Sequence, residues 1–306
     1  PIIDAILDFR AMTKLKSTYA DGLVKQIADD GRIHTTFQNM VTATGRLSST
    51  DPNLQNIPVR TEEGKEIRQA FLPRAGWVLL DADYSQIELR LMAHFSGDHA
   101  LVEAFRTGQD VHARTASEIF DVPLDEVDST LRSRAKAVNF GLIYGISGFG
   151  LAKNTGVSRQ EAQEFINRYF RKYPGVKRFM DSAAEDGQHN GYALTLMGRR
   201  RYLPELKSDK AVVREFGKRA AMNTPVQGTA ADIIKLAMVR VDEALRREGL
   251  KSRLILQVHD ELLLECPPEE VEKAGKLLKD AMEHVIELRV PLLAEVHQGT
   301  NWAEAK

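Results

Sequence analysis

Leu254-Ile-Leu-Gln-Val-His-Asp-Glu-Leu-Leu-Leu-Glu265 is the stretch that decides the fold. Two apolar runs rich in Leu, Ile and Val predict buried strands, and the three polar residues between them predict a tight hairpin turn. These residues are His259, Asp260 and Glu261. A buried carboxylate needs a positive partner to stay charged, so a metal ion at the hairpin tip is one interpretation. A solvent-exposed turn is the other, and the hairpin taken alone favours it because Asp is a common turn residue.

Length and charge set broad limits on the protein. The 306 residues exceed the usual size of one domain, so one large domain or two interlocked domains are expected. A net charge of −1 argues against a uniformly basic, nucleic-acid-coating protein. The charge is uneven, however: residues 131–178 contain ten Lys or Arg and two acids, whereas residues 266–306 contain five basic and eight acidic residues. This asymmetry fits a polyanion held by one part of the molecule.

Cysteine content and hydropathy exclude several classes of protein. The single cysteine, Cys266, rules out an internal disulfide and a Cys-x-x-Cys zinc site, and favours a reducing compartment. No apolar run approaches the roughly 18 residues of a membrane span, and no signal-peptide pattern opens the chain, so no membrane partner is expected. Because the chain begins at Pro1 and not at Met, we expect a fragment or a processed product.

A second acidic strand end precedes a helix. Residues 77–84 predict a buried strand that ends in acids, and Asp83 lies at the kind of strand terminus where α/β proteins bind ligands. Ser85 and Glu88 have the spacing of a helix capping box, which gives them a structural interpretation.

The helix predicted over residues 129–144 carries an unusual stripe. Arg132, Lys136, Phe140 and Tyr144 recur at steps of four and therefore share one face. Exposed aromatics in line with charges are uncommon without a partner. We therefore favour a bound nucleotide, with the cations on its triphosphate and the aromatic rings stacked on its base and sugar. A solvated basic face is the alternative.

The remaining segments are predicted more coarsely. Residues 1–25 indicate a helix, 191–202 a hairpin with a basic turn, 268–286 an acidic helix and 292–296 an edge strand. The polar residues 42–58 are either plain connection or suited to contacts with phosphates and base edges. Residues 212–248 indicate a long helix that Pro225 should kink or break, which leaves the helical spacing of Gln227 from Asn223 open.

Three segments resemble the polymerase motifs of family A, the bacterial DNA polymerase I family. They are Asp83-Tyr-Ser-Gln-Ile-Glu-Leu-Arg90, Arg132-x-x-x-Lys-x-x-x-Phe-Gly-x-x-Tyr-Gly145 and Val258-His-Asp-Glu261. The segments Thr44-Gly-Arg-Leu-Ser-Ser49, Pro52-Asn-Leu-Gln-Asn-Ile-Pro58 and Pro225-Val-Gln-Gly-Thr-Ala-Ala-Asp232 also match. The resemblance is in order and covers nearly the whole chain.

The resemblance implies an α+β fold. A palm with a small antiparallel β-sheet would carry the catalytic carboxylates, and a largely α-helical insertion would form the fingers. The implied parts are the end of a thumb at residues 1–25, the first part of the palm at 26–95, the fingers at 96–210 and the second part of the palm at 211–306. A thumb reduced to its last helix implies weak, strongly salt-dependent duplex binding.

The implied reaction is template-directed DNA synthesis, which adds deoxynucleotides to a primer 3′-hydroxyl and releases pyrophosphate. Asp83, Asp260 and the backbone carbonyl of Tyr84 would hold two Mg²⁺ ions, which prefer oxygen ligands. Two such ions stabilise the attacking and the leaving oxygens. Lys136 would protonate the departing pyrophosphate, and Glu261 would be a supporting acid.

The resemblance also implies the substrate contacts. The expected nucleotide-binding residues are Arg132, Lys136, Phe140, Tyr144, His112, Gln86 and Glu88. The expected DNA-binding residues are Arg46, Arg219, Asn223, Gln227 and His259, several of which would donate to the minor groove, where every base pair presents similar acceptors. Glu88 would block a ribose 2′-hydroxyl, and Phe140 in place of Tyr implies poor use of dideoxynucleotides.

The implied partners are primer–template DNA and deoxynucleoside triphosphates. The resemblance suggests a monomer in the bacterial cytoplasm, associated with the nucleoid and acting in replication and repair. A nuclease also uses paired carboxylates, but a proofreading site would need an acid cluster of its own. A single-subunit RNA polymerase is disfavoured by Glu88, and a non-catalytic DNA-binding module by the intact Asp83, Asp260, Lys136 and Arg132.

Overall fold

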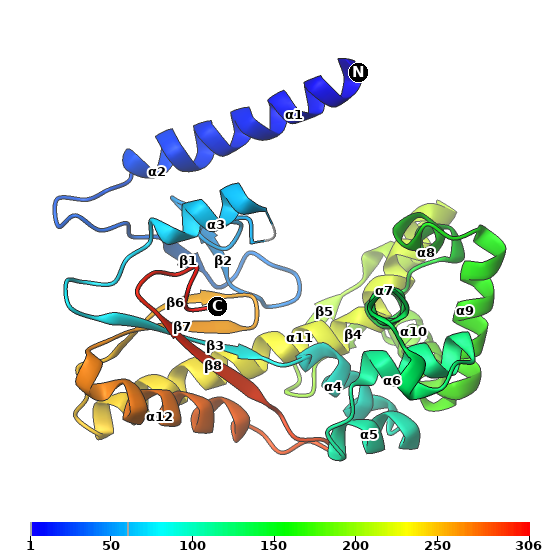
Figure 1. The fold of residues 1–306 in the computed structure, drawn as a ribbon. Helices are drawn as coiled ribbons and strands as arrows, with labels where there is room; N and C mark the ends of the chain where they lie inside the picture. Colours follow the sequence, from blue (N-terminus) through cyan, green and yellow to red (C-terminus); the bar gives the residue numbers. More distant parts are fainter. Residues whose placement is uncertain (1, 60) are drawn as a thin grey trace. The chain divides into compact units, whose positions relative to one another are not determined.

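A computed structural model describes residues 2–59 and 61–306. The chain forms two compact units: unit 1 contains the residues up to Asp83, residues 237–282 and residues 294–306, and unit 2 contains residues 84–236 and 283–293. Helices and small antiparallel sheets occur in both units (Figure 1), which confirms the predicted α+β class. The four-part division into thumb, palm and fingers stays a prediction.

Unit 1 is built on a four-stranded sheet. Its order is β6 (Arg253–Val258), β7 (Glu261–Cys266), β3 (Val78–Tyr84) and β8 (Ala294–Gly299), as Figure 1 shows. β7 pairs antiparallel with both β6 and β3. The predicted hairpin, the acidic strand and the edge strand are all confirmed, although β8 begins two residues later than expected.

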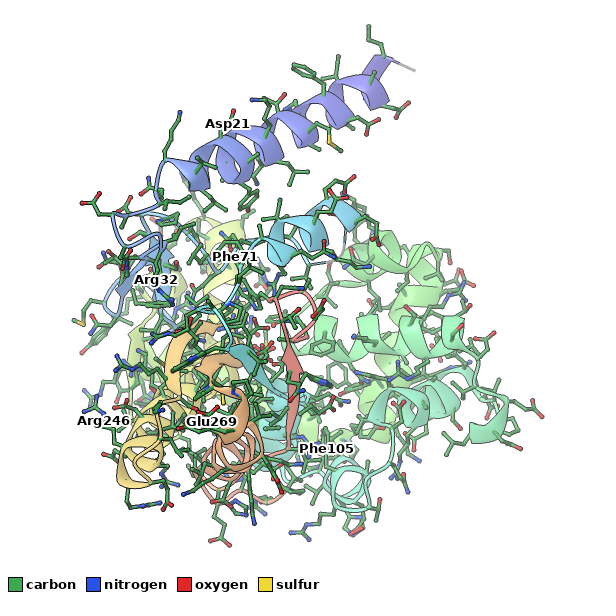
Figure 2. All side chains as sticks on the ribbon, turned by 60° about the vertical axis from the view of Figure 1, so that its left-hand side comes forward. Asp21, Arg32, Phe71, Phe105, Arg246 and Glu269 are labelled. Carbon is green, nitrogen blue, oxygen red and sulfur yellow. The ribbon has the colours of Figure 1, made fainter. Side chains whose placement is uncertain are left out.

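The two faces of β3 differ in chemistry. Because side chains alternate along a strand, Leu79, Asp81 and Asp83 share one face, while Leu80 and Ala82 share the other. The acid-bearing face lies over a buried core cluster of Tyr19, Leu23, Leu54, Ile57, Leu79, Leu256, Val258, Leu263, Trp302 and Ala305. The ring of Phe71, labelled in Figure 2, packs edge-on against Trp302 with 5.4 Å between the ring centroids.

Short elements complete unit 1. The chain starts with α1 (Ile2–Leu15), a π-helical turn (Lys16–Ala20) and α2 (Asp21–Val24), as the helical pattern predicts. The strands β1 (Thr36–Gln38) and β2 (Ser48–Thr50) pair with each other, and α3 (Glu62–Gln69) follows them. The acidic helix α12 spans Val271–Glu283 after a 3-10 turn at Pro268–Glu270.

Unit 2 is mainly helical. Its helices are α4 (Ile87–Ser96), α5 (His99–Arg106), α6 (Val111–Phe120), α7 (Ser129–Ile143), α8 (Gly148–Thr155), α9 (Arg159–Lys172) and α10 (Pro174–Asn190). Side-chain oxygens of Asp98, Asp110, Asp128, Ser147 and Ser158 accept backbone N–H bonds where α5 to α9 begin. The predicted hairpin is confirmed as β4 (Tyr192–Leu194) and β5 (Arg200–Tyr202).

The helix α11 (Ala211–Arg247) is continuous, so the prediction that Pro225 breaks it is wrong. A proline removes one backbone donor, but most helical stability in proteins comes from packing, and Ala221 and Val226 on either side are fully buried. The Thr224 hydroxyl also donates to the Ala220 carbonyl at 2.6 Å. Helical spacing therefore holds across the proline. None of the described helices is long and apolar enough to span a bilayer.

Candidate active site

The hairpin tip is a two-residue turn. β6 ends at Val258 and β7 begins at Glu261, so His259 and Asp260 form the turn and Glu261 belongs to a strand. His259 has a φ of 55°, a left-handed conformation that is uncommon for residues other than glycine. The Gln257 side chain donates to the His259 carbonyl at 2.6 Å. The Gln55 amide in turn donates to the backbone and side-chain oxygens of Gln257, both at 3.1 Å, so the polar segment 42–58 supports the tip.

Strand register places Asp83 beside this tip, opposite Glu261. Burial, and then the charge of Asp260, raise the pKa of Asp83 to about 7. The Oδ1 atom of Asp83 is buried and has no hydrogen-bond partner among the described residues. A cation bound beside Asp83 would stabilise the charged form of this buried carboxylate.

Asp81 is a third carboxylate that was absent from the predicted site. It is 2% exposed, and its Oδ1 atom has no hydrogen-bond partner within the described chain. Burial and then the charge of Glu261 raise the pKa of Asp81 to about 8, while Lys306 and Arg68 lower it. The signal in the sequence was its position two residues before Asp83, which puts both acids on one face of the strand.

Two cations hold Glu261. Its side chain is almost fully buried, Lys306 Nζ contacts its Oε2, and Arg68 Nη1 lies 3.8 Å from its Oε1. The Arg68 guanidinium also lies 4.2 Å from the ring centroid of Trp302. Burial lowers the pKa of Arg68, and the charges of Glu261 and Asp81 oppose this effect. Glu261 is therefore the anion of a buried ion network, a role that differs from that of Asp83 and Asp260.

Asp83 and Asp260 fit a magnesium site. Mg²⁺ prefers carboxylate and carbonyl oxygens and keeps several ligands from water or phosphates. The two aspartates supply carboxylates, and Tyr84, the next residue of β3, supplies a carbonyl. Across the described part of the chain, no three His, Cys, Asp or Glu side chains converge as a closed metal centre. The carboxylate and carbonyl donors thus suit a Mg²⁺ ion that keeps part of its water shell.

The cation and aromatic stripe of α7 is exposed at three of its four residues. Arg132 and Lys136 are exposed, Phe140 is half-buried, and the side chain of Tyr144, at the end of the helix, is 39% exposed. The opposite stripe is packed inward: Ala135, Val138 and Leu142 are buried and Leu131 is half-buried. Arg132 Nε donates to Asp110 Oδ2 at 2.7 Å.

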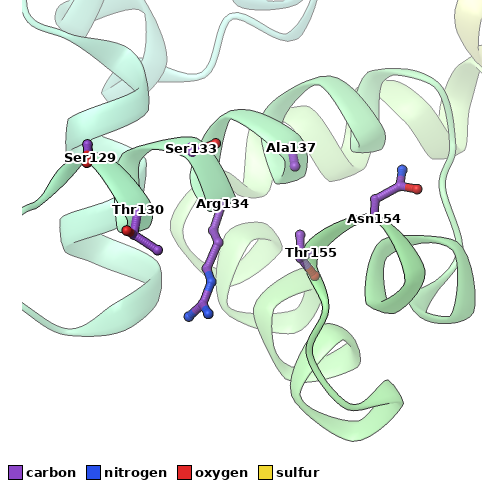
Figure 3. A pocket seen from close by; sticks show the side chains of 7 residues that line it. All are labelled: Ser129, Thr130, Ser133, Arg134, Ala137, Asn154 and Thr155. Atoms are coloured by element: carbon purple, nitrogen blue, oxygen red, sulfur yellow. The ribbon is translucent and has the colours of Figure 1, made fainter.

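A pocket of about 630 Å³ brings Phe140, Tyr144 and Arg219 together. Its other lining residues are Ala137, Gly141, Gly145, Ile146, Ser147 and Asn154. Gly145 has a φ of 67°, and a Cβ atom there would lie 2.9 Å from Arg219 Cγ, so only glycine permits this approach. A second pocket of about 460 Å³ (Figure 3) is lined by Ser129, Thr130, Ser133, Arg134, Ala137, Asn154 and Thr155.

Glu88 does not form the predicted capping box with Ser85. α4 begins at Ile87 and is preceded by Gln86, whose left-handed backbone (φ 54°) places Ser85 one residue too early to cap the helix. Glu88 is instead 7% exposed and accepts a 2.6 Å hydrogen bond from the Tyr144 hydroxyl. The Oε1 atom of Gln86 is buried without a hydrogen-bond partner in the described residues.

His112 lies in the first turn of α6 and is 2% exposed. Its Nδ1 atom is 3.0 Å from Asn139 Nδ2, and its ring centroid is 5.7 Å from that of Phe140. Burial lowers the pKa of His112 to about 4, so its imidazole is neutral at physiological pH.

The predicted DNA contacts fall in both units. Arg46 and His259 belong to unit 1, and the Thr42 hydroxyl donates to the Arg46 carbonyl at 2.6 Å. Arg219, Asn223 and Gln227 lie four residues apart on α11 in unit 2 and are half-buried. The Oδ1 atom of Asn223 is buried and unpaired within the described chain.

The fold and site together define a class: an α+β protein with carboxylates at a hairpin tip and a helix that carries a stripe of two cations and two aromatic rings. Residues 1–304 match the family model for DNA polymerase family A, and the chain belongs to that family. It is 52% identical to DNA polymerase I of Geobacillus stearothermophilus over 307 residues, and 54% identical to that of Pseudomonas aeruginosa over 301 residues.

The chain spans only about a third of these relatives. The matches cover 100% and 98% of this chain but 35% and 33% of the respective relatives. A solved structure described as the POL domain of Pol1 from M. smegmatis, in complex with DNA primer-template and dNTP, superposes with a TM-score of 0.95. That protein is 49% identical, and the match covers 100% of this chain and 54% of the other.

Proposed function

We propose that this chain catalyses template-directed DNA synthesis, adding deoxynucleotides to a primer 3′-hydroxyl and releasing pyrophosphate. The observation that carries the proposal is the position of Asp83 beside the hairpin tip, opposite Glu261, where burial and the charge of Asp260 raise the pKa of Asp83. Membership of DNA polymerase family A supports it, as does a related structure described as a complex with DNA primer-template and dNTP.

The end of β3 and the hairpin tip would supply the metal ligands. Asp83, Asp260 and the Tyr84 carbonyl would hold two Mg²⁺ ions. When bound, such ions stabilise negative charge on the attacking 3′-oxygen and on the leaving pyrophosphate oxygen. The carboxylates must lose any bound proton to act as ligands, so a pKa near 7 for Asp83 makes metal affinity rise with pH. Glu261, held by Lys306 and Arg68, would keep the tip oriented.

Unit 2 would bind the incoming nucleotide. Arg132 and Lys136 are exposed cations one turn apart, which suits a triphosphate. Arg132 would exchange its pairing with Asp110 for a phosphate oxygen. Lys136 would donate a proton to the pyrophosphate as it leaves. Phe140 would pack on the sugar and base, Tyr144 would stack at the template position, and Glu88 and Gln86 would contact the sugar.

Five residues would contact the primer–template. Arg46, Arg219, Asn223, Gln227 and His259 carry hydrogen-bond donors, and minor-groove acceptors occur in similar places in all base pairs. Such contacts test pairing geometry without choosing a sequence, as a copying enzyme requires. We further propose that the chain acts as a monomer in the bacterial cytoplasm, associated with the nucleoid, in replication and repair.

Primer extension tests the proposal. The wild-type chain should extend a primer with four deoxynucleotides and Mg²⁺, and stop when EDTA is added. Asp83→Asn and Asp260→Asn should each lose extension, whereas Asp29→Asn, a matched change at an exposed acid of unit 1, should retain it. A folded wild type that degrades the primer or leaves it unchanged would refute the assignment, as would an active Asp83→Asn variant.

A further inference from the structure

A buried network of polar side chains contacts His112 in unit 2. Asn139 of α7 is 1% exposed, and its Nδ2 atom lies 3.0 Å from His112 Nδ1 and 3.2 Å from Thr115 Oγ1. Thr115 is fully buried, and its hydroxyl also lies 3.2 Å from Asn139 Oδ1 and 3.4 Å from the Tyr173 hydroxyl. The Asn139 amide therefore bridges the His112 ring and the Thr115 hydroxyl, with its nitrogen facing His112 Nδ1.

This contact determines where the imidazole carries its proton. An amide nitrogen donates two hydrogens and accepts none, so His112 Nδ1 must be the acceptor in the 3.0 Å contact. A neutral histidine has one protonated nitrogen. When one ring nitrogen accepts a hydrogen bond, the proton lies on the other. The proton of His112 consequently sits on Nε2.

We propose that Asn139 is a positioning residue, which fixes His112 as the Nε2–H tautomer so that a neutral imidazole offers one N–H donor to a phosphate oxygen of the nucleotide. The identity of this ligand rests on the proposed function. The tautomer itself is a property of the chain and can be tested without it.

The surroundings explain why a neutral donor is useful here. The charged groups that act on His112 are Asp110, which caps α6 two residues earlier, and Arg132 and Lys136 on α7. The two cations and burial oppose a further positive charge, and Asp110 only partly offsets them. Without Asn139, the opposite tautomer would turn an Nε2 lone pair toward a phosphate oxygen, which is a repulsive arrangement.

NMR of the full chain with ¹⁵N-labelled histidine tests the tautomer, with the His112 signals assigned by their absence from His112→Gln. The wild type should show a neutral ring protonated at Nε2 from pH 6 to pH 8. In Asn139→Asp the new carboxylate should accept from Nδ1–H, so the neutral form should become Nδ1-protonated and the pKa of His112 should rise by about two units. Asn167→Asp, the same change at an exposed residue of α9, should leave His112 unaltered.

The wild-type spectrum needs no variant, so misfolding of Asn139→Asp would leave this test intact. A wild-type ring protonated at Nδ1 would overturn the proposal. So would an Asn139→Asp protein that is folded and keeps the wild-type tautomer.

Kinetics test the positioning role. In primer extension at saturating Mg²⁺, KM for the deoxynucleotide should be flat between pH 5 and pH 8 for the wild type. For Asn139→Asp it should rise about tenfold above the new pKa of His112 and recover below it, because the imidazolium again carries Nε2–H. The double variant Asn139→Asp/His112→Gln should lose this pH dependence. A flat KM in Asn139→Asp would overturn the role.

If the wild type fails to extend primers, the proposed function fails while this inference stays testable. A titration with dATP alone, followed at the Nε2 signal of His112, then tests whether this N–H donates to a phosphate. A saturable shift that Asn139→Asp weakens at pH 8 supports the inference, and an unchanged signal refutes it.

Discussion

The Tyr144 hydroxyl donates a 2.6 Å hydrogen bond to Oε2 of Glu88, linking the end of α7 to the first turn of α4. Glu88 is almost fully buried, and Tyr144 lines the pocket shared with Phe140 and Arg219. A side chain fixed in this way can exclude a substrate by its position, because moving it would break a hydrogen bond to a carboxylate.

Glu88→Ala is expected to admit ribonucleotides. Discrimination by one small group in a pocket is typically worth roughly 10- to 200-fold. We expect the ratio of kcat/KM for deoxynucleotides to that for ribonucleotides to decrease by a factor in this range. Glu88→Gln keeps the size of the side chain and should retain most of the discrimination. Tyr144→Phe removes only the hydrogen bond and should have an intermediate effect. An unchanged ratio in Glu88→Ala would rule out this role.

Asp83 should make the metal-free protein less stable as pH rises. Its pKa in the folded chain is about 7 against an ordinary 3.8, so between about pH 4 and pH 7 the folded state holds a proton that the unfolded state releases. The free energy of unfolding should therefore fall across this window. Each pKa unit is worth about 1.4 kcal/mol, which sets about 4 kcal/mol as an upper limit.

Urea unfolding in EDTA at pH 5 and pH 8 measures this effect. Asp83→Asn removes the titrating group, so its unfolding free energy should decline less between the two pH values than that of the wild type. Asp81→Asn should behave similarly, with a window that extends to about pH 8. Equal declines in the wild type and both variants would contradict the prediction.

Lys306→Met should weaken the support of Glu261. The buried carboxylate would keep only Arg68, at 3.8 Å, as a cationic partner. Loss of one partner from a buried ion pair costs about 3 to 5 kcal/mol, and because the Lys306 side chain is 33% exposed we expect about 1 to 3 kcal/mol. Primer extension should slow without being abolished. Lys306→Arg should recover both properties, and Lys276→Met, at an exposed position of α12, is the matched control.

His112 should contribute to acid instability. The pKa of His112 is lowered from 6.5 to about 4 in the folded chain. Between these pH values the unfolded chain binds a proton that the folded chain does not. The contribution of His112 to stability is therefore fully present above pH 6.5 and is lost as pH falls toward 4. The difference is worth about 3 kcal/mol at most. His112→Gln should lose less unfolding free energy than the wild type between pH 7 and pH 4. Parallel unfolding curves for the two proteins would exclude this contribution.

Sequence patterns predicted the elements that depend on periodicity. The hairpin and the acidic strand follow from apolar runs that end in polar residues, the α7 stripe follows from a spacing of four residues, and each is present. The helix break at Pro225 was wrong because tertiary packing outweighs a local loss of one hydrogen bond. The capping box was wrong because the backbone conformation of Gln86, which spacing does not report, shifts the start of α4.

The site residues that could be predicted are those in short sequence motifs. Asp81 was missed although the strand period places it on the face of Asp83, because an acid inside an apolar strand has no obvious partner in sequence. Its charge environment comes from Glu261, Lys306 and Arg68, which are far away along the chain. The Asn139 contact was missed for the same reason: it joins two helices through buried side chains.

The pairing of β3 with β7 has a consequence for folding. A slip of one residue would move Asp81 and Asp83 to the opposite face and would bring Leu80 and Ala82 to the hairpin tip. Such a molecule would bury its acids away from Arg68 and Lys306 and would also lack the paired carboxylates. Chains with the wrong register would thus be both unstable and inactive. The specific activity after refolding would therefore be proportional to the fraction of molecules with the correct register.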